Sequence, residues 1–416
     1  MLNKKSSITF LLLFAYSLAA CQSIAPLEST RLVLAIDSIL NAQVQGDKIP
    51  GAVIQIKKGN KIIYKHAYGF AQKYDFNHHL LGTPEIMTSD HLFDIASLTK
   101  VIGTTTSIML LVDRGKIKID DPIHKFIPSF TGPEKNKITI RHLLTHTAGL
   151  QEWYPLYYRA SNKMACYKVI DDLPLKYAVG SGRRYSDLGF VLLGRIIENV
   201  SNMPLEVFMK QNIFIPLGMK NTLYNPLADL SPRLIAATSP GNPYEKRMVY
   251  DSTLGYQFME INPVAWNGWR TYVLKGEVND GNAWYANGGV SGAAGLFSTI
   301  EDLQRLIDVL LAKGKAGNKQ FMSAKTIQIM LTKDKFKNGL GWMMDTENAI
   351  MKHGPRGTFG HTGFTGTSIV AMPPYNTSII LLINRQNTGL LTTREYYNVT
   401  PVRQAVFNAV LNYCKE

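Results

Sequence analysis

The chain has 416 residues and a formal net charge of +14, and 45% of its residues are hydrophobic. This composition is that of a globular protein with a sizeable core, and it excludes an extensively disordered chain. The Lys and Arg residues are scattered along the sequence rather than gathered in one tract, which argues against a nucleic-acid-binding protein and favours a solvated face that suits anionic lipid or cell-wall polymers.

The N-terminus has the pattern of an export signal. Lys4 and Lys5 precede an almost unbroken apolar run that is too short to span a bilayer comfortably. The run ends in small residues before Cys21, which resembles the lipidation signal of bacterial lipoproteins. We therefore predict a signal peptide over 1–20, lipidation of Cys21 and a tether over 21–30, although an ordinary signal peptide with a chance cysteine is the alternative. An exported bacterial lipoprotein, anchored in a membrane and facing the periplasm or cell exterior, is expected.

The first predicted elements after this segment are a hairpin and a helix. Two β-rich runs, 52–56 and 61–64, flank a turn that contains Gly59. Apolar residues then recur at helical spacing over 98–112, and Gly115 is the expected stop.

The rest of the chain is helical first and β-rich later. Apolar periodicity predicts four more helices, at 188–200, 205–211, 301–311 and 402–413. Alternating or continuous β-rich runs predict three more strands, at 340–344, 367–372 and 378–383. This order predicts an α/β protein of the α+β type, with one domain over 31–416. Both chain ends complete one sheet flanked by helices, and a mostly helical subdomain is inserted over about 97–335.

One serine precedes a lysine by three positions, at Ser97 and Lys100. Positions i and i+3 share a helix face, so the amine can reach the hydroxyl. Asp94 is the expected N-cap of the helix, which would place Ser97 in its first turn. A serine hydroxyl is a weak nucleophile until a base takes its proton, and a lysine must lose its own proton to be that base.

Two later motifs complete a pattern with this pair. Tyr185-Ser186-Asp187 lies in the stretch GSGRRYSDLGFVLLG, and His361-Thr362-Gly363 leads into a predicted strand. The three motifs, in this order, resemble those of the serine β-lactamase and penicillin-binding-protein superfamily, namely Ser-x-x-Lys, Ser- or Tyr-x-Asn and Lys-Thr-Gly. Three further stretches are similar to its class C β-lactamase-like branch: IRHLLTHTAGL, YSDLGFVLLGRIIE and GGVSGAAGLFSTIEDL.

The resemblance implies an antiparallel sheet and a serine hydrolase that forms an acyl-enzyme. Ser97 is then the nucleophile, while Lys100 and Tyr185 share the proton transfers, and the charge of Lys100 should lower the pKa of Tyr185. The backbone N–H groups of Ser97 and Phe364 would form the oxyanion hole. The residues that would orient the substrate are Asp187, His361, Thr362, Gly363 and Phe364. No metal and no cofactor is implied.

Three positions depart from the family pattern. Asp187 stands where most relatives have asparagine, and Ala293 stands where several have histidine. His361 replaces a lysine whose charge helps to bind a substrate carboxylate, and a histidine is mostly neutral at pH 7. This last departure weakens the case for efficient β-lactam hydrolysis.

The sequence leaves three functions open. The first is a cell-envelope peptidase or carboxypeptidase acting on D-Ala-D-Ala peptides of the peptidoglycan type. The second is an esterase or weak β-lactamase that uses the same site on small esters or β-lactams. The third is a catalytically silent, wall-binding lipoprotein, against which the intact Ser97, Lys100 and Tyr185 argue.

Other candidate groups are interpreted as structural. His142 and His146 have the spacing of a zinc pair, but a leucine occupies the position where that motif has glutamate. Cys166 and Cys414 are the only cysteines after Cys21, and nothing in the sequence decides whether they pair. The aromatic run 153–158 suits either loop packing or a substrate cleft.

Overall fold

A computed structural model describes residues 27–416. The predicted signal peptide, the lipidation of Cys21 and most of the predicted tether lie outside these residues. The tether was predicted to extend to residue 30, but helix α1 (Leu27–Gln45) already includes its last four residues. None of the described helices is long and apolar enough to cross a membrane.

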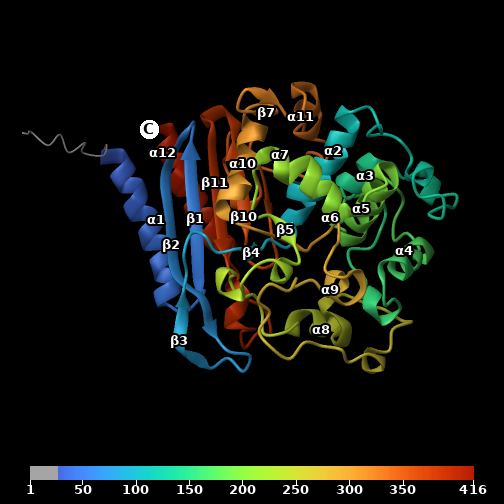
Figure 1. Ribbon diagram of the computed structural model, residues 1–416, viewed down its shortest axis with the longest axis horizontal. Coiled ribbons are helices and arrows are strands. Elements are labelled where there is room, and N and C mark those ends of the chain that lie inside the picture. Colours follow the sequence, from blue (N-terminus) through green and yellow to red (C-terminus); the bar gives the residue numbers. More distant parts are fainter. Residues whose placement is uncertain (1–26) are drawn as a thin grey trace, which may run out of the picture.

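The main sheet joins the two ends of the chain, as predicted (Figure 1). Its six strands, in order across the sheet, are β3 (Leu80–Ile86), β2 (Lys61–Tyr74), β1 (Gly51–Lys58), β11 (Thr377–Ile383), β10 (Ser368–Met372) and β9 (Phe359–Thr362). Every pairing is antiparallel, and Ile54 of β1 lies opposite Leu381 of β11 at the junction of the two halves. The predicted hairpin at 52–64 and two of the three later strands are confirmed.

Residues 340–344, the other predicted strand, form no strand. Met343 makes only isolated bridges, to Asn338 and to Gly360. Gly341 has φ +75°, and a Cβ there would lie 2.1 Å from the Oγ1 of Thr105. The left-handed backbone interrupts the extended conformation, so this apolar segment packs as a loop.

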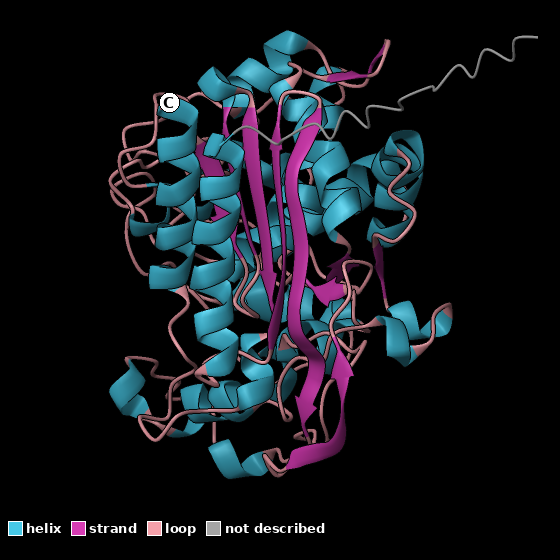
Figure 2. Cartoon of the chain, turned by 90° about the vertical axis from the view of Figure 1, so that its left-hand side faces the viewer, coloured by secondary structure: helices cyan, strands magenta, loops and turns pink. Residues whose placement is uncertain are grey.

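Helices cover both faces of the sheet (Figures 1 and 2). Helix α1 and α12 (Thr400–Lys415) pack side by side on one face, where alternate residues of β11 such as Ile379 and Leu381 meet them. The intervening residues Ile380 and Leu382 face the larger core on the other side. Because strand β11 is buried on both faces, it reads as a continuous apolar run rather than as an alternating one.

The segment between β3 and β9 is mostly helical. Its helices are α2 (Thr106–Asp113), α3 (Ile140–Leu144), α4 (Lys163–Asp172), α5 (Asp187–Ser201), α6 (Leu205–Met209), α7 (Ile215–Leu217), α8 (Pro243–Tyr250), α9 (Gly281–Asn287), α10 (Ile300–Leu311) and α11 (Ala324–Met330). It also has two small antiparallel sheets, one of β4 (Phe93–Asp94), β6 (Leu296–Ser298) and β5 (Leu223–Tyr224), and one of β7 (Lys315–Ala316) and β8 (Lys319–Gln320).

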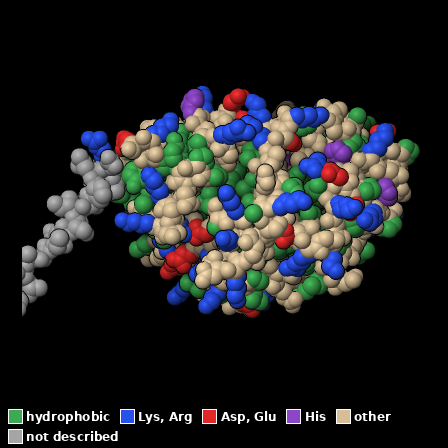
Figure 3. All heavy atoms as spheres, turned by 90° about the horizontal axis from the view of Figure 1, so that it is seen from above, with side chains coloured by type: hydrophobic (Ala, Val, Ile, Leu, Met, Phe, Trp, Pro, Cys, Tyr) green, Lys and Arg blue, Asp and Glu red, His purple; other side chains and the backbone are tan. Residues whose placement is uncertain are grey.

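The charge distribution agrees with a scattered basic surface. Figure 3 shows Lys and Arg side chains spread across the face seen from above, with fewer Asp and Glu side chains between them. Cys166 and Cys414 are both buried, free thiols, so they do not form the disulfide that the sequence left open.

Helix α1 supplies a test of the packing on the sheet. Ile36 is fully buried against it, whereas Leu34 on the same helix is 63% exposed. We expect Ile36→Val to lower the free energy of unfolding by about 1 kcal/mol, because one buried methyl group is lost. Leu34→Ala should change it by less than about 0.5 kcal/mol. Urea denaturation followed by circular dichroism measures both, and equal losses would contradict this packing.

Candidate active site

Ser97 lies in a tight turn between strand β4 and the helical segment that begins at Leu98. Ala96, just before it, has a left-handed backbone with φ +45°, which costs about 1 kcal/mol for a residue with a side chain. Asp94 stabilises the turn, because its Oδ1 accepts from the Ala96 N–H at 2.8 Å and its Oδ2 accepts from the Asn279 N–H at 2.6 Å. The predicted N-cap role of Asp94 is therefore wrong, since it ends a strand and holds the turn that carries Ser97 instead.

Lys100 is 1% exposed and lies directly beside Ser97. Its Nζ donates to the Ser97 Oγ at 3.0 Å and to the Ala293 carbonyl at 2.8 Å, and it forms an ion pair with the Asp187 Oδ1 at 2.6 Å. Burial alone lowers the pKa of Lys100, but the charge of the Asp187 carboxylate beside it raises that pKa above its ordinary value. Lys100 is thus an ammonium group with two hydrogen-bond acceptors and one ion-pair partner, and one of the acceptors is the carbonyl of Ala293, a residue that departs from the family pattern.

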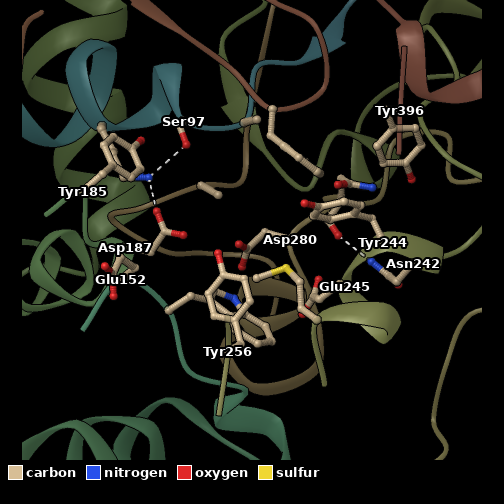
Figure 4. A pocket seen from close by; sticks show the side chains of 17 residues that line it. Ser97, Glu152, Tyr185, Asp187, Asn242, Tyr244, Glu245, Tyr256, Asp280 and Tyr396 are labelled. Carbon is tan, nitrogen blue, oxygen red and sulfur yellow. Dashed lines mark hydrogen bonds and ion pairs between the residues drawn. The ribbon is translucent and has the colours of Figure 1, made fainter. Parts of the chain in front are cut away.

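Tyr185 completes the group next to Ser97 and Lys100. The Lys100 Nζ lies 5.1 Å from the centre of its ring, and Figure 4 shows the Tyr185 ring on the same side of the site as Ser97. Burial raises the pKa of Tyr185 above its ordinary value, and the Lys100 charge offsets this only in part. The predicted lowering of this pKa is therefore wrong, because burial of the ring raises the pKa of Tyr185 by more than the Lys100 charge lowers it.

Strand β9 brings the third motif to the site. His361 is buried, and its Nδ1 donates to the Thr362 carbonyl at 2.9 Å. Burial and the nearby Lys100 charge lower the pKa of His361 to about 3, so the ring is neutral. Its neutrality agrees with the prediction from sequence, and it leaves no cation at the position where the family pattern has lysine.

The turn after β9 packs against the turn that carries Ser97. A Cβ on Gly363 would lie 2.5 Å from the Ile95 carbonyl and 2.1 Å from the Thr367 Oγ1, so only glycine allows this approach. Within residues 27–416, neither the Ser97 N–H nor the Phe364 N–H donates to a protein acceptor. Both residues line the cavity, as the predicted oxyanion hole requires.

The site opens into a cavity of about 360 Å³ (Figure 4). Ser97, Lys100, Tyr185, Asp187 and Phe364 line it, whereas His361, Thr362 and Gly363 do not. The residues that sequence reasoning missed come mainly from the loops at 216–290 and from the segment after Leu150. They are Glu152, Trp153, Asn242, Tyr244, Glu245, Met248, Tyr256, Asn279, Asp280, Ala294 and Tyr396, together with Ala96.

Two of these missed carboxyl groups have unusual environments. Burial, reinforced by the charge of Asp187, raises the pKa of Asp280 to about 6. Burial and the charge of Asp280 raise the pKa of Glu245 to about 8. The aromatic run also contributes one wall residue, Trp153, while Tyr157 packs against the Trp266 ring at 4.6 Å.

The histidine pair is structural, as predicted. The Nδ1 of His142 accepts from the backbone N–H of Thr139 in a capping box at the start of α3. His146 accepts from the Ser186 N–H at 3.0 Å, and its ring lies 4.4 Å from the ring of Tyr185. In the described part of the chain, no three His, Cys, Asp or Glu side chains are grouped to hold a metal ion.

Comparisons with known proteins agree with the family that the three motifs indicate. The family model described as Beta-lactamase matches residues 36–401. An N-acetylmuramyl-L-alanine amidase of Bacillus subtilis (strain 168) is 33% identical over 393 residues, which are 89% of this chain and 85% of the relative. A "Putative D-alanyl-D-alanine carboxypeptidase" of Escherichia coli (strain K12) is 34% identical over 374 residues, which are 84% of this chain and 82% of the relative.

Solved structures share the fold. The hydrolase EstCE1, described as having promiscuous acyltransferase activity, superposes with a TM-score of 0.66 at 20% identity, covering 91% of this chain and 99% of its own. A class C beta-lactamase superposes with the same score at 17% identity, covering 93% and 99%.

The family match and the fold together make this chain a serine hydrolase of the β-lactamase and penicillin-binding-protein superfamily. This chain belongs to the Beta-lactamase family.

Proposed function

We propose that this chain is an exported serine amidohydrolase that cleaves an amide bond of peptidoglycan-type peptides through an acyl-enzyme on Ser97. The observation that carries the proposal is the Ser97 Oγ, 3.0 Å from the Nζ of a buried Lys100 at the wall of a cavity. Support for the substrate class comes from the two relatives, which are named for amide bonds of this polymer. Export and lipidation at Cys21 rest on the sequence pattern.

The first step forms the acyl-enzyme. The Ser97 Oγ attacks the substrate carbonyl carbon, and the charge that develops on the oxygen is stabilised by the N–H groups of Ser97 and Phe364. The proton of Ser97 passes through the Lys100 and Tyr185 pair to the departing nitrogen, so that the C–N bond breaks and an amine leaves.

The second step releases the acyl group. A water molecule attacks the Ser97 ester carbonyl and gives its proton, through the same pair, to the Ser97 Oγ. The ester bond then breaks, and a carboxylic acid leaves while the serine hydroxyl is restored. This chain's residues perform both steps without a redox change.

The bond between two D-alanines is the first candidate for cleavage, and a neutral His361 favours a second. A carboxypeptidase must hold the terminal carboxylate of its substrate, yet His361 is neutral where the family pattern has a cationic lysine. An amide that is not followed by a free carboxylate, such as the bond between an N-acetylmuramyl group and L-alanine, needs no such cation. Ester or β-lactam hydrolysis at the same site is the remaining catalytic alternative.

A substrate comparison tests these possibilities. Purified protein without its signal peptide is incubated with a D-Ala-D-Ala peptide, an N-acetylmuramyl-L-alanine peptide, a chromogenic cephalosporin and short-chain aryl esters. We expect the highest kcat/KM for one of the two peptidoglycan amides. Turnover of the esters or the cephalosporin alone would contradict the proposal, and turnover of none would favour a silent wall-binding scaffold.

A further inference from the structure

Two arginines bind the turn that carries Phe364, and neither of them lines the cavity beside Ser97. Arg385 follows strand β11, and Arg403 lies in the first turn of α12. Both side chains donate to backbone carbonyls of the turn at 363–367. Because they stand outside the cavity, any effect that they have on the reaction must pass through this turn.

Arg403 holds the peptide unit that contains the Phe364 N–H. Its Nη2 donates to the Thr367 carbonyl at 2.9 Å and to the Gly363 carbonyl at 3.3 Å, which also accepts from the Gly366 N–H at 3.1 Å. The Gly363 carbonyl and the Phe364 N–H belong to one trans peptide, in which the two groups point in opposite directions. A carbonyl held toward Arg403 therefore directs the Phe364 N–H away from Arg403.

Arg385 holds the next carbonyl of the turn. Its Nε and Nη2 donate to the Phe364 carbonyl at 3.1 and 2.8 Å, and its Nη1 donates to the Tyr397 carbonyl at 3.0 Å. The guanidinium also lies 5.4 Å from the centre of the Phe364 ring. Arg385 thus contacts both the backbone and the side chain of Phe364, so the two arginines together fix the peptide on each side of this residue.

The two guanidinium groups hydrogen-bond to carbonyls and not to carboxylates. Within residues 27–416, every hydrogen bond that either side chain donates goes to a backbone carbonyl, and the Arg403 Nε is enclosed without an acceptor. Glu395 acts on Arg385 only at longer range and pairs with Arg247 at 2.8 Å. Burial and the charge of Arg385 lower the pKa of Arg403 to about 9. Because two neighbouring buried cations without a counter-ion oppose folding, stability does not account for this pair.

We propose that Arg385 and Arg403 are positioning residues that orient the Phe364 N–H toward the oxyanion and strengthen it as a donor. A hydrogen bond to the carbonyl of a peptide polarises that peptide and makes its N–H a stronger donor. The two positive charges behind the turn also favour the negative charge that develops on the substrate oxygen. The inference rests on the proposed acyl-enzyme at Ser97, and it extends the stabilisation of the oxyanion to two residues outside the cavity.

Substitution of each arginine tests this role with 4-nitrophenyl acetate, a neutral ester that has no carboxylate for an arginine to bind. We expect Arg385→Gln and Arg403→Gln each to lower kcat about tenfold with little change in KM, because the charge develops only in the transition state. Lysine at either position keeps the cation and should recover about threefold of the loss. Arg233→Gln, at an exposed arginine, is the matched control and should behave as the wild type. An unchanged kcat in both glutamine variants would overturn the inference.

Two further measurements separate positioning from a purely structural role. Benzeneboronic acid adds to a serine hydroxyl as a tetrahedral anion, so it should bind each glutamine variant about tenfold more weakly than the wild type. Thermal unfolding should shift by less than about 3 °C, because each substitution also removes one of two like charges. Wild-type boronate affinity in both variants, or a kcat loss that appears only with a large drop in unfolding temperature, would overturn the inference. Absence of Ser97-dependent ester turnover in the wild-type protein would overturn the proposed function instead.

Discussion

Ser97→Ala is expected to lower kcat by about 10⁴-fold or more for every substrate that the protein turns over. The acyl-enzyme requires the Oγ, and among the described residues the hydroxyl of Ser97 is the one to which the Lys100 Nζ donates a hydrogen bond. Tyr185 is the poorer nucleophile, because burial keeps its phenol protonated by raising its pKa. The residual rate should equal what positioning and the two N–H groups provide alone.

Intact mass spectrometry with a fluorescent penicillin and with an activated ester checks this expectation directly. The wild-type protein should gain the mass of one acyl group, and Ser97→Ala should gain none. The substitution removes only an acceptor for Lys100, so thermal unfolding should shift little and loss of labelling cannot be attributed to misfolding. An adduct that persists on Ser97→Ala would place the nucleophile elsewhere.

The sequence was sufficient to predict that Ser97 and Lys100 lie in contact, because the two residues belong to a motif with a fixed local geometry. Ser97 and Lys100 lie one turn apart, and the confirmed contact of 3.0 Å follows from that spacing. The sheet was also predictable, since the runs around Ile54 and Leu381 are β-rich and lie at opposite ends of the chain. In both cases short-range patterns determined the outcome.

The substrate pocket was not predictable in this way. Glu245 and Asp280 lie in a loop-rich region without periodicity, and they meet only because α8 and α9 pack together, with Glu245 accepting from the Gly281 N–H. The helix α1 was missed as well, because its apolar residues mix with polar ones that face solvent. Tertiary contacts, rather than local preference, set these features.

The electrostatics of the centre also required the structure. The sequence placed a cation next to Tyr185 and so predicted a lowered pKa for the phenol. The structure adds two facts, the enclosure of the Tyr185 ring and the pairing of Lys100 with Asp187 at 2.6 Å. Because the Asp187 carboxylate partly neutralises the Lys100 charge, that charge stabilises a phenolate at Tyr185 less strongly.

Asp187, which stands where most relatives have asparagine, therefore has a defined effect on the pKa of Lys100. Asp187 raises the pKa of Lys100, which keeps the amine protonated and unable to accept the Ser97 proton until it gives one up. An asparagine would accept a hydrogen bond from Lys100 without opposing its deprotonation. The family departure at 187 thus gives Lys100 a higher pKa than an asparagine there would.

In Asp187→Asn, the ascending limb of the pH profile of kcat/KM should move to lower pH by about 1–3 units. The sign follows from the ion pair: Asp187 raises the Lys100 pKa, removal of its charge lowers that pKa, and the neutral amine then forms at lower pH. Because the wild-type midpoint lies above the ordinary lysine pKa of about 10.5, profiles from pH 6 to 12 with a neutral activated ester, corrected for spontaneous hydrolysis, measure the shift, and the exposed Glu347→Gln is the control. An unchanged midpoint would show that neutral Lys100 is not the base, and a shift to higher pH would show that the carboxylate of Asp187 itself receives the proton.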